Sequence, residues 1–164
     1  MTYNYSAKFT AKERCNNSEH NGKLPTLTTV QEIQGGKISG VFNFVFTLER
    51  KLKLSEDITI KRTVNCGLAY DNKDAYYLKR NGHIHLCMAD ESNTMNPVFA
   101  AGEAHFTEGT LTTLTSDSGT FACEGDEHKQ QSIHAFRENW GNLKDVIYKE
   151  YIGGDKYNDS ILDK

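Results

Sequence analysis

The sequence predicts an α+β fold, with a mostly antiparallel β-sheet or partly closed barrel followed by two short C-terminal helices. Apolar and polar residues alternate through much of the chain up to about residue 115, which is the period of β-strands. Clusters of Asn, Asp and Gly separate these stretches and are typical of turns. After Cys123 the apolar residues recur three and four apart, as in helices. Strands followed by helices are typical of α+β domains.

The first half of the chain offers three candidate strands. Residues 3–9 alternate cleanly and predict a half-buried strand. Residues 27–33 predict a second strand, which the Gly35-Gly36 pair would end. The strongest pattern is in residues 38–48, where one face carries several large apolar side chains and should point into the core. Those residues are Ile38, Phe42, Phe44, Phe46 and Leu48.

Four further stretches extend the predicted sheet. Even-numbered residues between 58 and 70 are mostly apolar, interrupted at Arg62, where a bulge would fit. Asn81-Gly82 favours a hairpin into a strand over residues 83–88. Residues 98–106 and 110–115 predict two more strands, separated by a turn at Glu108-Gly109.

The C-terminal part predicts helices. Ile133, Phe136 and Trp140 have helical spacing, and Gly141 stands where a helix would be capped. Asn142 could begin a second short helix that reaches Tyr151. We therefore expect one β-rich domain over residues 1–154, ending in two helices, and a polar tail over residues 155–164.

Composition excludes several classes of function. The chain has 19 Lys and Arg against 22 Asp and Glu, without long runs of one sign, which argues against a nucleic-acid partner. The N-terminus has no signal-peptide pattern, and no stretch has membrane-spanning length. We expect no membrane partner and a location in the cytoplasm, or export without a cleaved signal peptide. The four cysteines form no C-x-x-C pair, so reduced thiols are expected, with two disulfides as the alternative.

Most of the polar chemistry lies in two neighbouring segments. In a strand over residues 83–88, His83, His85 and Cys87 would share one face. The same alternation places Glu103 and His105 together. If the two strands pair, all five side chains lie on one surface.

This set could hold a divalent metal ion. Two imidazoles of a His-x-His strand can reach one ion, and Glu103 or His105 could complete the ligands of a site with His83 and His85. The pattern is loosely similar to the His-x-His of cupins, although the later Glu spacing differs. The pattern favours a solvated polar sheet face over a metal site, because His-rich strands are common without a metal.

A thiol site is the second catalytic hypothesis. Cys87 or Cys123 could act as a nucleophile if the fold brought His85, His128 or His134 close to it. A cysteine that is simply a small buried apolar residue is the alternative.

Residues 98–141 resemble a known family. They carry Ala100-Ala101-Gly102-Glu103, a strand, a Gly turn, a second strand, Ser118-Gly119-Thr120-Phe121 and a closing helix. This order resembles the globular region of plant calmodulin-binding IQ-motif proteins and related bacterial toxin- or effector-associated domains. Those relatives have His and Tyr after Ser-Gly, where this chain has Thr120 and Phe121. The resemblance implies an effector-like or interaction role.

Three functions follow as hypotheses. The first is a binding module of the effector or toxin-associated type, which recognises a protein or small ligand through the polar sheet face. Its expected ligand-binding residues are His83, His85, Glu103, His105 and Ser118. The second is a small enzyme with a metal or thiol site built from His83, His85, Cys87, Glu103 and His105. The third is an immunity-type or structural partner protein.

Overall fold

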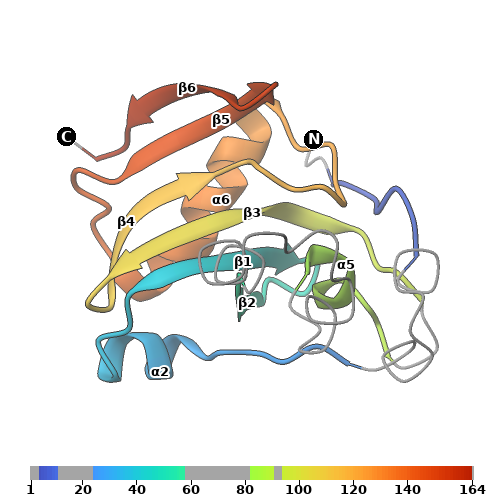
Figure 1. Ribbon diagram of the computed structural model, residues 1–164, viewed down its shortest axis with the longest axis horizontal. Coiled ribbons are helices and arrows are strands. Elements are labelled where there is room, and N and C mark those ends of the chain that lie inside the picture. The colour runs from blue at the N-terminus through green and yellow to red at the C-terminus, as the bar shows by residue number, and fades with distance from the viewer. Residues whose placement is uncertain (1–3, 11–23, 58–81, 91–93, 164) are drawn as a thin grey trace, which may run out of the picture.

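The computed structural model describes residues 4–10, 24–57, 82–90 and 94–163. These residues form a six-stranded sheet with strand order β2-β1-β3-β4-β5-β6 (Figure 1). The strands are β1 (Gly40–Thr47), β2 (Leu52–Glu56), β3 (Val98–Thr107), β4 (Thr110–Thr115), β5 (Ile147–Gly153) and β6 (Lys156–Ile161). The helices are α2 (Val30–Gly35), α5 (His83–Leu86) and α6 (Gly125–Trp140).

The sheet is open and mostly antiparallel, so the predicted α+β class is confirmed and the closed form of the barrel alternative is not found. β4 and β5 pair in parallel, whereas the other neighbouring strands run antiparallel. A parallel pair needs a crossover connection, and α6 supplies it between β4 and β5. In Figure 1, α6 lies behind the sheet and α5 lies in front of it.

The larger core lies between the sheet and α6. Phe42, Phe44 and Phe46 of β1 face it, as their common parity predicts. Phe44 meets Phe136 of α6 edge to face, with 5.0 Å between the ring centroids. Leu48 does not belong to this core: β1 ends at Thr47, and Leu48 is 40% exposed in the turn that follows.

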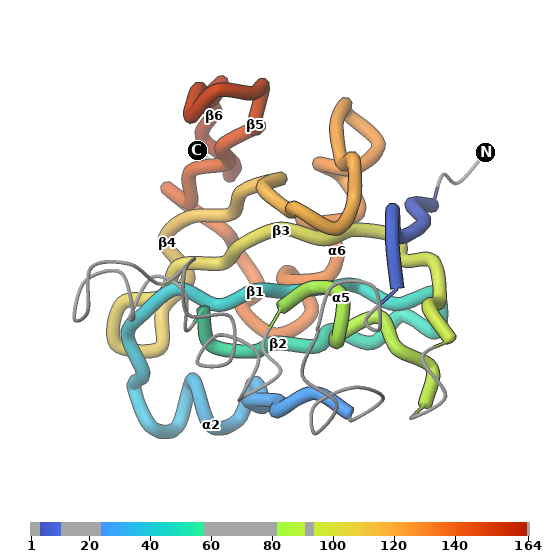
Figure 2. Tube along the Cα trace, turned by 45° about the vertical axis from the view of Figure 1, so that its right-hand side comes forward, coloured from blue at the N-terminus to red at the C-terminus, as the bar shows by residue number. Residues whose placement is uncertain are grey.

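A second, smaller core lies on the opposite side of the sheet, under α5. Its buried members come from β1, β3, α5 and the segment after β4, and they are Val45, Ile84, Leu86, Cys87, Met88, Val98, Ala101, Phe121 and Cys123. The N-terminal segment closes it at the side, where Tyr5 and Val98 form an isolated bridge (Figure 2). The sheet therefore has apolar packing on both faces at its β1–β3 side.

Two predicted N-terminal strands were wrong. Residues 30–33 belong instead to α2, because Thr29 caps the helix by accepting a hydrogen bond of 3.1 Å from the Glu32 N–H, and Thr28 forms only an isolated bridge with Leu54. Thr29-Val-Gln-Glu32 is a capping-box pattern that the period-2 interpretation overlooked. Residues 4–10 show the predicted burial alternation but form no regular strand: Tyr5 makes an isolated bridge with Val98, and the Lys8 N–H donates to Thr120 O over 3.0 Å. The predicted strand over 58–70 and the Asn81 turn lie outside the described residues.

The C-terminal prediction was half right. The first helix is α6, and Gly141 ends it with φ 61° and an N–H that donates to Arg137 O. The second predicted helix is instead β5, and the residues expected as a loose tail form β6. A short apolar run is compatible with both the helical and the strand period. Here the run pairs with the free edge of β4 and is therefore a strand. The strands predicted at 98–106 and 110–115 are confirmed as β3 and β4.

Candidate functional site

The predicted strand over residues 83–88 was wrong. His83–Leu86 form the short helix α5, and every residue from Gly82 to Met88 is buried. Alternation of polar and apolar residues indicates a strand with one solvated face only when one side of the segment contacts solvent. Here both sides of the segment contact protein. His83, His85 and Cys87 consequently do not form a common polar surface. His85 is completely buried.

His83 nevertheless reaches β3. Its Nε2 lies 2.7 Å from the Gly102 carbonyl oxygen, which accepts the hydrogen bond. Burial lowers the pKa of His83, while the Gly102 bond and the charges of Glu103 and Asp117 act in the opposite direction. The buried imidazole therefore ties α5 to the central strand as a neutral donor.

Glu103 and His105 share the α5 side of β3, as predicted. Glu103 Oε1 lies 3.8 Å from His105 Nε2, and their side chains are 19% and 35% exposed. Glu103 pairs with Asn43 of β1 and Thr115 of β4, so it stands in the middle of the sheet. Its carboxylate is the centre of what we call the polar cluster: His83, Glu103, His105, Asp117 and Tyr157.

Two members of the polar cluster were missed by the sequence analysis. Asp117 follows β4, and the Tyr157 hydroxyl of β6 donates to its Oδ2 over 3.0 Å. Burial raises the pKa of Asp117, and the neighbouring Glu103 charge raises it further. Asp117 directly precedes the Ser-Gly turn that the sequence singled out. No sequence pattern pointed to Tyr157, because the segment from residue 155 was predicted to be a polar tail.

The proposed metal ligands are not assembled. Within the described ranges, no group of three or more His, Cys, Asp or Glu is placed to hold a metal ion. The Nε2 of His83 is hydrogen-bonded to the Gly102 carbonyl oxygen, and His85 is buried within α5. Ser118 serves the local fold, since its Oγ accepts hydrogen bonds from the backbone N–H groups of Thr120 and Phe121. Such a bond pattern shapes a turn.

The thiols are poorly suited to nucleophilic chemistry. Cys87 and Cys123 are free and buried, and burial raises the pKa of each to about 12. The Cys87 thiol donates to Ile84 O over 3.3 Å. A catalytic cysteine instead needs a lowered pKa to supply thiolate at neutral pH. Cys15 and Cys66 lie outside the described residues.

His128 is a structural histidine rather than a base for Cys123. Its Nδ1 lies 3.0 Å from the Tyr148 hydroxyl, and its Nε2 lies 2.9 Å from the Ala101 carbonyl oxygen. The β3–β4 ladder ends at the Glu103 and Thr115 pair, so the Ala101 peptide has no strand partner from β4. The buried imidazole replaces that partner. Burial lowers the pKa of His128 to about 4.

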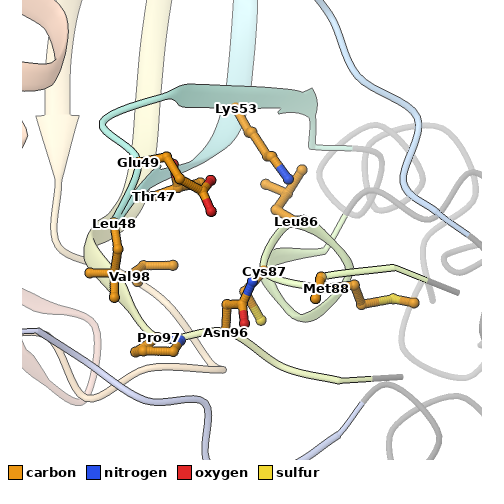
Figure 3. A pocket seen from close by; sticks show the side chains of 11 residues that line it. Thr47, Leu48, Glu49, Lys53, Leu86, Cys87, Met88, Asn96, Pro97 and Val98 are labelled. Atoms are coloured by element: carbon orange, nitrogen blue, oxygen red, sulfur yellow. The ribbon is translucent and has the colours of Figure 1, made fainter. Parts of the chain in front are cut away.

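A pocket of about 220 Å³ opens on the α5 side of the sheet, between the β1–β2 turn, α5 and the start of β3 (Figure 3). Carboxylate, ammonium and carboxamide groups reach it from Glu49, Lys53 and Asn96. The remaining lining is largely apolar, and consists of Thr47, Leu48, Leu86, Cys87, Met88, Ala89, Pro97 and Val98. The accessible part of the lining is about equally polar and apolar. Small-molecule sites combine apolar walls with a few polar groups that orient the ligand.

Comparison with protein families, curated proteins and solved structures finds no match for this chain. Within the part of the chain that the structure describes, no helix has both the length and the apolar character needed to cross a bilayer. A proposed function for this protein therefore rests on the geometry of the pocket and of the polar cluster.

Proposed function

We propose that the protein is a binding module that holds a small ligand in the pocket beside α5. The pocket carries this proposal, because polar side chains from two segments converge on one hollow: Glu49 and Lys53 from the β1–β2 hairpin, and Asn96 from the segment before β3. This is the small-ligand form of the binding role inferred from the sequence, on the same side of the sheet. The resemblance of residues 98–141 supports an effector or toxin-associated setting.

The pocket is built on rigid elements, which favours specific binding. β1 and β3 supply Thr47 and Val98, and these residues pair across the sheet. On the opposite side, Leu86 at the end of α5 and Met88 just after it are buried in the small core and support the pocket from below its surface. A preformed wall loses little conformational entropy when a ligand enters.

The enzyme alternative has weaker support. Its thiol form requires a thiolate, whereas burial raises the pKa of both described cysteines. Its metal form requires ligands that the described residues do not bring together. What favours an enzyme is the polar cluster, where the raised pKa of Asp117 beside Glu103 is typical of a proton-transfer site.

The test fills the pocket and follows binding. Ala89 lines the pocket and is exposed at its mouth, so Ala89→Trp should occupy the hollow without disturbing the core. A panel of amino acids, organic acids, amines, sugars and nucleosides is titrated into the ¹⁵N-labelled full chain. We expect at least one compound to shift the amide signals of Leu86 to Val98, and Ala89→Trp to weaken that compound at least about tenfold.

The matched control is Ala122→Trp, because Ala122 is exposed but does not line the pocket. It should bind the same compounds as the unchanged chain. The proposal would be contradicted if the amide shift changes persist in Ala89→Trp. It would also be contradicted if no compound of the panel changes the amide signals of the pocket residues. Shifts centred on Glu103 and Asp117 instead would favour the polar cluster as the working site.

A further inference from the structure

The pocket divides by chemistry into a charged side and an apolar side. Glu49 and Lys53 flank it from the β1–β2 turn and β2, and Figure 3 shows both charged ends directed into the space. Leu48, Ala89 and Pro97 supply the accessible apolar side of the lining. A ligand that fits must therefore carry polar and apolar ends together.

The two charges lack partners within the described part of the chain. The ion pairs there join Arg137 to Asp163 and Lys149 to Asp159, with His105 beside Glu103. No described ion pair or side-chain hydrogen bond engages Glu49 or Lys53. Two opposite charges at one pocket, each without a partner, are available to a ligand.

Lys53 lines the pocket and is partly buried. Its charge acts on the Cys87 thiol, where it opposes the effect of burial on the thiol pKa. Cys87 lines the pocket and is almost completely buried. Lys53 thus stands on β2 at one side of the pocket, while Glu49 stands on the exposed turn between β1 and β2.

We propose that the pocket, given the binding role above, takes a zwitterion of about the size of a single free amino acid with an apolar side chain. The ligand ammonium would pair with Glu49 and the ligand carboxylate with Lys53. Its side chain would lie against Leu48, Ala89 and Pro97. Asn96 offers both a donor and an acceptor to the ligand head group.

Size and charge exclude the neighbouring ligand classes. The volume of about 220 Å³ is smaller than the pockets of drug-sized molecules, which span about 300 to 1,000 Å³. A polyanion such as a nucleotide would meet Glu49, and a polyamine would meet Lys53. Only a ligand that carries both signs satisfies both side chains.

The test uses L-leucine and two analogues that each lack one charge: 4-methylpentanoate and 3-methylbutan-1-amine. Titration calorimetry on the full chain should show that leucine binds at least about tenfold more tightly than either analogue, which corresponds to one lost charge-assisted contact. Lys53→Gln should weaken leucine about tenfold and leave the amine unchanged. Glu49→Gln should weaken leucine similarly and leave the carboxylate unchanged.

Glu138→Gln is the control, because Glu138 is exposed on α6 and does not line the pocket. It should bind leucine like the unchanged chain. The inference is overturned if leucine binds no better than its analogues, or if both pocket variants bind it normally. If other compounds bind and Ala89→Trp blocks them while leucine fails, the zwitterion is wrong and the binding role stands. If Ala89→Trp blocks nothing, both fail.

Discussion

His128 shows how one buried side chain can replace a piece of sheet. Both of its ring nitrogens have partners, Tyr148 and the Ala101 peptide, and Tyr5 meets the ring edge to face. The neutral imidazole can donate from Nε2 to the Ala101 carbonyl and accept from the Tyr148 hydroxyl at Nδ1. Protonation would remove the acceptor and bury a charge, so the fold holds His128 in its neutral form.

This burial makes the stability of the protein depend on pH. The pKa of His128 is about 4 when folded, against 6.5 for an ordinary histidine. The unfolded chain therefore binds more protons between these values, and stability is lost as pH falls from about 6.5 to 4. Between pH 7 and pH 5, His128 is expected to lower the free energy of unfolding by about 2 kcal/mol. His83, whose pKa is also lowered, adds a share of the same sign.

We predict that His128→Gln lowers stability at pH 7 but shrinks the difference between pH 7 and pH 5 by about 2 kcal/mol, because Gln can keep a hydrogen bond but does not titrate. Urea unfolding at the two pH values measures this difference. His134→Gln, at an exposed position of the same helix, should keep the full difference. An unchanged difference in His128→Gln would show that His128 is not the titrating group.

For individual site residues, the sequence predicted the placement correctly where it depends only on the alternation of side chains along a strand. Glu103 and His105 share a face because β3 is a regular strand at that point. His83 lies beside Glu103, but it reaches it from a helix instead of the predicted strand. Asp117 and Tyr157 come from separate segments that only the folded chain brings together.

At the scale of elements, β3 and β4 approach unusually closely at Gly102. A Cβ at this position would stand 1.9 Å from the Thr115 carbonyl oxygen and 3.2 Å from the Phe44 ring. The Glu103 N–H donates to the Thr115 side-chain hydroxyl over 3.2 Å, so the ladder is irregular there. Gly102 also accepts the hydrogen bond of His83. The missing side chain is what allows these contacts.

We predict that Gly102→Ala destabilises the protein by about 1 to 3 kcal/mol or more, because the clash is with backbone and cannot be relieved by a rotamer change. Thermal or urea unfolding measures the loss. Gly119→Ala is the matched control, since nothing lies within 4 Å of its added Cβ, and it should be nearly neutral. Equal stability of the two variants would mean that β3 and β4 can separate at little cost.

At the scale of the whole molecule, the C-terminal residues complete the sheet. β6 pairs with β5 along most of its length. Beyond it, the Leu162 N–H donates to Val146 O, and Leu162 packs against the larger core. Asp163 accepts hydrogen bonds from Arg137 and from the Leu143 N–H, which fixes the end of the chain to the region after α6. The segment that read as a loose tail is therefore an edge strand.

We predict that a chain ending at Gly154 loses at least about 2 kcal/mol of stability, because it gives up the β5–β6 hydrogen bonds and the apolar contact of Leu162. It should also associate more readily, since β5 would become an unprotected edge. Urea unfolding and light scattering measure the two effects. A chain ending at Asp163 is the control and should behave like the full chain. An unchanged midpoint in the shorter chain would refute a structural role for β6.

The sequence by itself determined the α+β class, the apolar face of β1, the positions of β3 and β4, and the C-terminal cap of α6, because each depends on local periodicity and local capping. Only the tertiary structure decided the rest. Residues 83–88 and 147–153 carry apolar side chains that suit either period. In the fold, residues 83–86 form α5 and pack against β1 and β2, whereas residues 147–153 form β5 and pair with β4. The pocket joins the β1–β2 turn, α5 and the start of β3. Such a convergence arises from packing between segments distant in sequence, which no local pattern encodes.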